Sequence, residues 1–299
     1  MRNRTILGMP VSFSAAVAAV CLLGIAAGSF LDFDISEALA NRTALGEFVA
    51  AHAVFFPCCV NAAGSGCLFA GLRKKGGACR LPAWGLLALG MFLAVNDANR
   101  AFGGSIRGLL GYTAGESAVW PVFLSYLIQT AFLAWIPALL VRFLDDSDPD
   151  RLIAVGAAIL AAGIAASGVN GWLKEFASRP RYKYLLKQED PRAAYRAWWQ
   201  MVPYLGGGDS LKSWPSGHMT QVTSVFTLPL ITGCLKKPGR LKSGIAADIA
   251  CAAALAVGYN RIHMTNHFLS DVCFGFLITY AIYAAVSAAC LKAAEKRPG

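Results

Sequence analysis

Charged side chains are scarce in this sequence. Only 15% of the 299 residues are Asp, Glu, Lys or Arg, whereas 56% are hydrophobic and the mean hydropathy is +0.51. Because an ordinary soluble domain has about a quarter of its residues charged, the composition argues against a soluble globular protein. The polar stretches between the apolar blocks are also too short to hold a soluble domain of normal size.

A cysteine framework is lacking as well. The sequence contains nine cysteines, but no two of them are spaced as a Cys-x-x-Cys pair, and all except Cys79 lie in apolar stretches. We therefore expect no disulfide framework and interpret these cysteines as small packing residues. Internal repeats are absent too, and the Ala-rich stretch 157–166 is best explained by close helix packing.

Long apolar runs dominate the sequence instead. About 20 apolar residues suffice to cross the hydrocarbon core of a bilayer as a helix. Runs of this kind occur at 11–31, 48–71, 82–102, 118–141, 152–173, 217–235, 243–260 and 267–291. The first is longer than the usual apolar region of a signal peptide, so we interpret it as an uncleaved span. The expected fold is an all-α, polytopic bundle of membrane helices.

The basic residues are divided unequally between the two ends of these spans. With a cytoplasmic N-terminus, and with the segment 174–216 set aside, one set of ends carries fifteen basic residues and the other carries four. Since cytoplasmic loops are enriched in Lys and Arg, the first set is predicted to be cytoplasmic. It comprises Arg2, Arg4, Arg73, Lys74, Lys75, Arg80, Arg142, Arg151, Lys236, Lys237, Arg240, Lys242, Lys292, Lys296 and Arg297; the second comprises Arg42, Arg100, Arg107 and Arg261.

The segment 174–216 has a character of its own. Its eight basic residues are interleaved with aromatic side chains of the kind that settle at the membrane interface, namely Tyr182, Tyr184, Tyr195, Trp198, Trp199, Tyr204 and Trp214. Such a loop suits the recognition of phosphorylated lipid head groups. In a membrane protein, topology and anionic lipids account for the net charge of +10, so membrane lipids are the expected partners and no nucleic acid is expected.

A first cluster of functional residues follows the fifth span. Lys174, Arg179 and Arg181 place three cations within eight residues, and Pro180 stops the helix by holding Arg179 extended. We expect both arginines to turn toward a common point. The planar guanidinium suits phosphate oxygens, whereas the lysine ammonium acts as a point charge. Whether Arg179 contacts a substrate or faces solvent stays open at this stage.

The second cluster opens the sixth span with the sequence Trp-Pro-Ser-Gly-His at 214–218. Ser216 lies where a helix N-cap is expected, and Gly217 lets the backbone approach a ligand closely. The free N–H groups of a helix N-terminus favour anions. His218 then presents a titratable group to the bound anion, although a histidine that merely anchors a helix end is the alternative.

The third cluster joins the seventh and eighth spans. His267 and Asp271 are four residues apart, so on a helix they share a face, and the carboxylate can orient one imidazole nitrogen while the other attacks. Arg261 precedes them. His263 lies one helical turn before His267, so a metal site formed by His263, His267 and Asp271 is a minor alternative. The predicted topology places all three clusters on the extracytoplasmic face.

Together the three clusters resemble the signature motifs of the type 2 phosphatidic acid phosphatase superfamily, over about residues 82–291. Lys174 and Arg181 have the spacing of the first motif, although Tyr182 replaces its final proline. Pro-Ser-Gly-His at 215–218 reproduces the second motif. Arg261, His267 and Asp271 match the third, with Asn260 in place of its serine.

The resemblance implies a metal-independent and cofactor-free phosphatase that acts on a phosphorylated lipid. His267 would be the nucleophile that forms a phosphohistidine, Asp271 would orient it, and His218 would protonate the leaving group. The phosphate oxygens would be bound by Lys174, Arg181, Ser216, Gly217 and Arg261. Phosphoryl transfer consists mostly of positioning and charge stabilisation, which cations can supply.

The expected organisation is a six-helix phosphatase core at 82–291, with two extra spans in residues 1–81 and a basic cytoplasmic tail at 292–299. A lipid phosphotransferase would use the same residues, with an acceptor hydroxyl in place of water. A non-catalytic phospholipid-binding or transport protein is the alternative from another class, but it leaves His218, His267 and Asp271 unexplained. The identity of the lipid and the oligomeric state do not follow from the motifs.

Overall fold

The computed structural model describes residues 5–296, except 110–118, 146–147, 201, 204–205, 207 and 238–239. For residues 100–105, 107–109 and 240–242 it describes the backbone without the side chains. Of the residues used to predict the topology, Arg2, Arg4 and Arg297 therefore lie outside the described part, as do Tyr204 and the side chains of Arg100, Arg107, Arg240 and Lys242.

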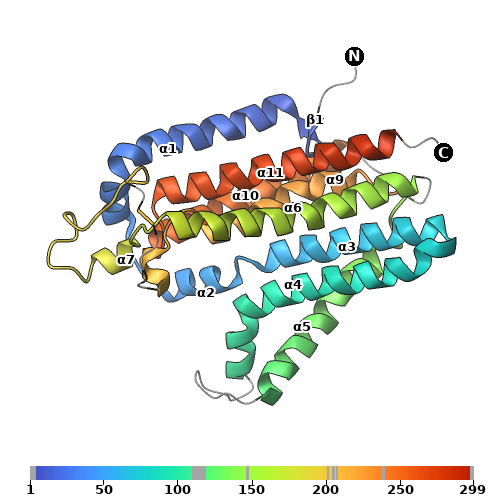
Figure 1. Cartoon of the computed structure of the whole chain (residues 1–299), viewed down its shortest axis with the longest axis horizontal. Helices are drawn as coiled ribbons and strands as arrows, with labels where there is room; N and C mark the ends of the chain where they lie inside the picture. The colour runs from blue at the N-terminus through green and yellow to red at the C-terminus, as the bar shows by residue number, and fades with distance from the viewer. Residues whose placement is uncertain are drawn as a thin grey trace. The chain divides into compact units, whose positions relative to one another are not determined.

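The described chain is mostly helical with almost no sheet (Figure 1), which confirms the all-α prediction. A two-stranded antiparallel hairpin, β1 (Thr5–Ile6) and β2 (Met9–Pro10), precedes the helices. The α-helices are α1 (Val11–Leu39), α2 (Ala44–His52), α3 (Phe55–Lys75), α4 (Arg80–Leu109), α5 (Val119–Leu140), α6 (Pro149–Phe176), α7 (Tyr182–Leu185), α8 (Gly217–Val222), α9 (Leu228–Thr232), α10 (Arg240–His263) and α11 (Leu269–Glu295). Short 3-10 helices cover Gly77–Cys79, Gly208–Leu211 and Thr223–Thr227.

Within the described residues, seven helical stretches are long and apolar enough to cross a membrane. They are Val11–Leu39, Ala44–Lys75, Gly77–Asn99, Val119–Leu140, Pro149–Phe176, Ser243–His263 and Leu269–Glu295. The prediction of a further membrane-spanning helix at 217–235 is wrong, because this region does not form a single helix. This region contains α8, a 3-10 turn and α9, because Pro229 cannot donate the backbone hydrogen bond that would continue the preceding helix.

Two compact units share the chain, and the long helices α6, α10 and α11 pass from one to the other. Unit 1 comprises residues 1–53, 164–223 and 250–282, whereas unit 2 comprises residues 54–163, 224–249 and 283–299. The first predicted span, with the connection after it, thus belongs to the same unit as all three functional clusters. The expected division into extra spans at 1–81 and a phosphatase core at 82–291 stays a prediction.

Close packing of α1 against α11 sets the framework of unit 1. A Cβ atom added at Gly24 would lie 2.5 Å from Sγ of Cys273, and one at Gly28 would lie 3.0 Å from the backbone nitrogen of Ser270. Further along, the hydroxyls of Ser14 and Tyr280 are 2.7 Å apart. Small residues four apart allow this approach, and the pairs show that the two helices run antiparallel (Figure 1).

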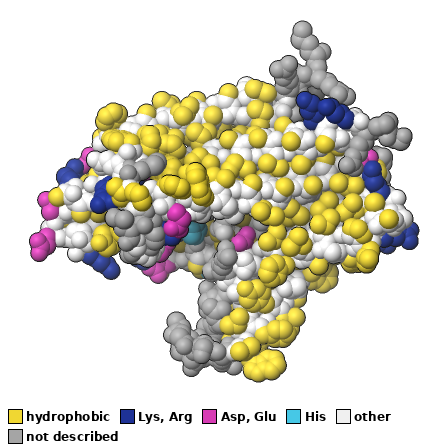
Figure 2. Space-filling view, viewed as in Figure 1, with side chains coloured by type: hydrophobic (Ala, Val, Ile, Leu, Met, Phe, Trp, Pro, Cys, Tyr) yellow, Lys and Arg dark blue, Asp and Glu magenta, His cyan; other side chains and the backbone are white. Residues whose placement is uncertain are grey.

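The surface of unit 1 has two kinds of side chain. Hydrophobic side chains cover α1 and α11 in Figure 2, as expected of helices that face lipid, and Leu23 and Phe30 are among the exposed ones. Charged side chains gather around α7 and the loop that follows it. This is the loop in which basic and aromatic residues alternate in the sequence.

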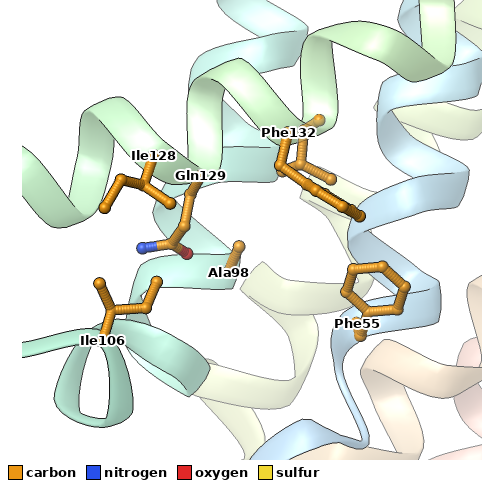
Figure 3. Close-up of a pocket in the computed structure, with 7 residues that line it drawn as sticks. Phe55, Ala98, Ile106, Ile128, Gln129 and Phe132 are labelled. Atoms are coloured by element: carbon orange, nitrogen blue, oxygen red, sulfur yellow. The ribbon is translucent and has the colours of Figure 1, made fainter. Parts of the chain in front are cut away.

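In unit 2, helices α3, α4 and α5 pack against one another and line an open pocket of about 240 Å³ (Figure 3). Its lining is apolar apart from Gln129, whose amide Nε2 donates to Oδ1 of Asn99 and to the oxygens of Ser125. The lining residues are Phe55, Ala98, Ile106, Ile128, Gln129, Phe132 and Leu133. None of the predicted site residues belongs to this pocket.

Candidate active site

His267 lies in the connection between α10 and α11, two residues before α11 begins. The expectation that His267 and Asp271 share a helical face is therefore wrong, since only Asp271 is in the helix. The carbonyl of Arg261 accepts hydrogen bonds from the backbone nitrogens of Asn266 and His267, both 3.1 Å away. Thr265 adopts a left-handed conformation (φ 60°) in this turn, so the chain reverses tightly around the imidazole.

The backbone of Ser213 determines which nitrogen of His267 is free. Nδ1 of His267 lies 2.7 Å from the carbonyl oxygen of Ser213. A carbonyl can only accept, so Nδ1 carries the proton and the lone pair of a neutral ring is on Nε2. The Asp271 carboxylate lies 3.8 Å from the same Nδ1. Ser213, which the sequence did not single out, thus takes the orienting contact that was expected of Asp271.

Asp271 is held rigidly in the first turn of α11. Its Oδ2 accepts from the Ser213 hydroxyl at 2.5 Å and from the backbone nitrogen of Phe268 at 2.9 Å, and its Oδ1 accepts from Nη1 of Arg179 at 2.5 Å. The Phe268 contact is half of a capping box, in which a carboxylate at the third helical position satisfies the N-cap nitrogen. The carboxylate is therefore placed to stabilise positive charge on the His267 ring.

Arg179 is buried at the centre of this arrangement, with 3% of its side chain exposed. A guanidinium has five N–H donors, and each of them has an acceptor here. These acceptors are the Arg196 carbonyl, Ser270 Oγ, Asp271 Oδ1, Asp32 Oδ2 and the Tyr195 hydroxyl. No donor is left for a substrate, so the open question about Arg179 is resolved in favour of an internal structural role.

The two arginines of the first cluster have different hydrogen-bond partners. Arg181 binds Asp209, with its Nη2 2.6 Å from the Asp209 carboxylate and its Nε 2.9 Å from the Asp209 carbonyl. Lys174 donates from Nζ to the carbonyl of Lys212 at 2.9 Å. Arg261, at the end of α10, is 5% exposed.

The second cluster joins the same group of residues. The backbone nitrogen of Ser216 donates to the carbonyl of Asp271 at 3.0 Å, and a Cβ atom at Gly217 would lie 4.0 Å from Cε of Lys174. Ser216 Oγ and Arg261 Nε are two of several buried side-chain atoms that have no hydrogen-bond partner within the described part of the chain. They are donors available to an anion. Since α8 has only six residues, its helix dipole adds less than expected.

His218 follows Gly217 and is half-buried. Its Nε2 lies 3.3 Å from the carbonyl of Ala50 in α2. Burial, together with the positive charges of Arg261, Arg181 and Lys174, lowers the pKa of His218 to about 3. The ring is therefore neutral at physiological pH before any anion binds, and a bound dianion would offset the cations and favour its protonation.

The pKa of His267 is lowered well below its usual range by the same causes. Burial is the largest, and Arg181, Arg261 and Lys174 add to it, while Asp271 opposes them. The positive charges of Arg181, Arg261 and Lys174 therefore act on both histidines. A neutral His267 with a free Nε2 is a competent nucleophile.

His263 is placed differently. Its Nδ1 lies 2.9 Å from the carbonyl of Leu39, and its ring stacks on Tyr259. In the part of the chain that the structure describes, no three His, Cys, Asp or Glu side chains are grouped as a metal site would require. The alternative of a site formed by His263, His267 and Asp271 therefore finds no support in the geometry.

One of the comparisons with known proteins found a match. Residues 151–294 match the family model described as the PAP2 superfamily. This stretch belongs to the PAP2 superfamily. No curated protein matches the chain, and no solved structure does so either. Membership of the PAP2 superfamily supports a phosphatase-type activity in general.

The PAP2 match begins with α6, so it contains every predicted site residue, but it leaves out α1 and α2. Those helices nevertheless reach the motifs. Asn260, which replaces the serine of the third PAP2 motif, donates from Nδ2 to the carbonyl of Gly46 in α2 at 2.9 Å. Asp32 of α1 binds Arg179. A signal for Asp32 was present in the sequence, because an acidic residue at the end of an apolar helix needs a partner.

The lowered pKa of His267 predicts how activity depends on pH. With an aryl phosphate whose leaving group needs no proton, kcat/KM reports the ionisation of the free enzyme and free substrate. After correction for substrate ionisation, kcat/KM should not fall between neutral pH and about pH 5, where an unperturbed histidine of pKa about 6.5 would be mostly protonated. A decline with a midpoint near the ordinary histidine pKa would show that the nucleophile titrates normally.

Proposed function

We propose that this membrane protein hydrolyses a lipid phosphate, either a phosphomonoester or a pyrophosphate, through a phosphohistidine on His267. The proposal rests on one observation above all. His267 is held by a backbone carbonyl with Nε2 free, in the field of Lys174, Arg181 and Arg261, within the stretch that belongs to a phosphatase superfamily.

The position of the cations supports a lipid substrate. Lys174 lies two residues before the end of the membrane-spanning stretch Pro149–Phe176, and Arg261 lies two residues before the end of Ser243–His263. Near Lys174 the apolar side chains of Trp172 and Phe176 are 61% and 49% exposed, beside the exposed carboxylate of Glu175, a mixture that suits the membrane interface. A phosphate bound at the helix ends would lie at the level of lipid head groups, with its acyl chains remaining in the bilayer.

In the first step, Nε2 of His267 attacks phosphorus while the bond from phosphorus to the leaving oxygen breaks. Positive charge develops on the imidazole, and the Asp271 carboxylate at 3.8 Å stabilises it. Arg181, Arg261, Lys174 and the Ser216 hydroxyl donate to the equatorial oxygens. When the phosphate binds, Arg181 exchanges the exposed carboxylate of Asp209 for a phosphate oxygen, so the positive charge of Arg181 stays paired.

His218 supplies the proton to the leaving oxygen. Its pKa of about 3 in the free protein results from burial and from the surrounding cations, so the proton is taken up when the phosphate charge offsets those cations. In the second step, neutral His218 accepts a proton from water while the water oxygen attacks phosphorus. The bond between phosphorus and Nε2 then breaks, which releases phosphate and restores the neutral ring of His267.

The extracytoplasmic face is part of the proposal. It rests on the unequal distribution of Lys and Arg in the sequence, which assigns the loop containing residues 182–216 to the side opposite the basic connections. A lipid phosphate presented in the outer leaflet would then be the substrate.

Substitution of the nucleophile tests the reaction directly. We expect His267→Ala to abolish turnover of lipid phosphates, because Nε2 is lost, while binding of phosphorylated lipid persists because the cations remain. The matched control is His52→Ala, which removes a histidine that stacks on Phe48 in α2 and should leave turnover near the wild-type rate. Released phosphate and phosphorylated lipid acceptors are both measured, which separates hydrolysis from transfer. Hydrolysis by His267→Ala at the wild-type rate would refute the mechanism.

The role of His218 is tested through the leaving group. His218→Ala should lower kcat by at least about 100-fold with an alkyl phosphate, the scale of general acid catalysis. With an aryl phosphate whose leaving group departs without a proton, the loss should be much smaller. An equal loss with both substrates would indicate that His218 has a structural role only.

Sidedness is tested with cysteines introduced at Ser210 and Ser243 in a background without the nine native cysteines. Ser210 lies in the loop that carries the functional residues, whereas Ser243 follows the basic connection assigned to the cytoplasm. A membrane-impermeant thiol reagent applied to intact cells should label only the cysteine at 210. Labelling of 243 without 210 would show that the site faces the cytoplasm.

A further inference from the structure

We propose that Asp32, in α1 and outside the stretch that matches the PAP2 superfamily, is a positioning residue for the phosphoryl-transfer site. It acts through Arg179 and Ser270 on Asp271 and, through Asp271, on His267. The inference rests on the proposed function, and it gives the first predicted span a role in the chemistry.

The contacts of Asp32 lead directly to the site. Its Oδ2 accepts from Nη2 of Arg179 at 2.9 Å and from the hydroxyl of Ser270, and its Oδ1 accepts from the backbone nitrogen of Ser270 at 3.0 Å. Ser270 immediately precedes Asp271 in the first turn of α11. Asp32 therefore caps that turn from another helix, and a carboxylate at a helix N-terminus is stabilising.

Arg179 connects the two carboxylates. Its Nη2 donates to Asp32 and its Nη1 donates to Asp271, while Arg196, Ser270 and Tyr195 accept from its remaining N–H groups. The aromatic ring of Phe268 lies under the guanidinium, with Cζ of Arg179 4.3 Å from its centroid. Since every donor is used, Arg179 cannot shift toward one carboxylate without losing a bond to the other.

Burial makes this arrangement stiff. The side chains of Asp32 and Asp271 are 0% exposed and that of Arg179 is 3% exposed, so water cannot replace a lost partner. Removing one member of such a network leaves the other charges uncompensated in a medium of low dielectric constant. Loss of the Asp32 charge therefore alters the contacts of Asp271 as well as those of Arg179 and Ser270.

The packing of α1 determines where Asp32 lies. Gly24, Gly28 and Asp32 are spaced four residues apart and follow one face of α1 along α11. A Cβ atom at Gly28 would lie 2.6 Å from Oδ1 of Asp32 and 3.0 Å from the backbone nitrogen of Ser270. The glycine thus leaves room for the carboxylate to reach the first turn of α11 from a second helix.

The consequence for kinetics is specific. Asp32→Asn keeps the shape of the side chain but removes its charge, so Arg179 is left with one carboxylate and the first turn of α11 with a weaker cap. We expect kcat to fall on the order of tenfold, the scale seen when a supporting partner of a functional side chain is removed. KM for a lipid phosphate should change by less than about twofold, because Lys174, Arg181 and Arg261 do not contact Asp32.

The matched control is Asp34→Asn, the same substitution two residues further along α1. Asp34 is half-exposed and pairs with Arg192 at the surface, so its loss should leave both kcat and KM unchanged. Should Asp32→Asn fail to fold, Gly28→Ala displaces the same carboxylate without altering its charge, and the same fall in kcat is expected. Equal kcat values for wild type and Asp32→Asn, or a change in KM alone, would overturn the proposal.

A double-substitution cycle separates positioning from a general loss of stability. In an Asp271→Asn background, measured in single turnovers, Asp32→Asn should change the rate by less than about twofold, because the residue through which it acts is already altered. The same tenfold fall in both backgrounds would mean that Asp32 only stabilises the fold, and would overturn the proposal. Activity in His267→Ala would refute the proposed function and this inference together, whereas an inactive His267→Ala with a fully active Asp32→Asn would refute this inference alone.

Discussion

The arrangement of unit 1 depends on the burial of one positive charge. A guanidinium away from water is costly unless all its donors are used and its charge is balanced. Arg179 meets this condition with five acceptors contributed by α1, the loop after α7 and the first turn of α11. Burial by itself would lower the pKa of Arg179, but the carboxylates of Asp271 and Asp32 outweigh it and raise the pKa. The charge is therefore fixed, and the elements that supply its acceptors are fixed with it.

This constraint divides the three cations of the first cluster between two tasks. Arg179 uses all five of its N–H donors within the protein. The positive charges of Lys174 and Arg181, in contrast, act on His218 and His267. Arg181 in particular is buried, with 9% of its side chain exposed, but its partner Asp209 is 74% exposed. The fully buried pairs define the geometry of the site, whereas the Asp209 carboxylate can return to water when a phosphate takes its place beside Arg181.

Much of the fold followed from the sequence because membrane helices are encoded by local composition. Apolar length predicted the long helices α1, α3 to α6, α10 and α11, and the resemblance of the motifs to a family suggested that Lys174, Ser216 and His267 serve one site. The break between α8 and α9 was missed because apolar length alone was used to place this span, although Pro229 within it was a visible signal for an interruption. The contacts of His267 with Ser213 and of Asp32 with Arg179 were missed for another reason. They join residues 54 and 147 positions apart, and no local pattern encodes such distances.

The contact between His267 and the carbonyl of Ser213 bears on how sequence variation at this site should be interpreted. The acceptor is a backbone atom, so every amino acid at position 213 supplies it as long as the loop keeps its path. The tautomer of the ring therefore does not depend on which residue is at position 213. The hydrogen bond to Asp271, in contrast, requires a side-chain hydroxyl there. A comparison of side chains at position 213 among homologous chains would therefore detect only the contact with Asp271. The backbone contact that selects the free nitrogen of His267 would not appear in such a comparison.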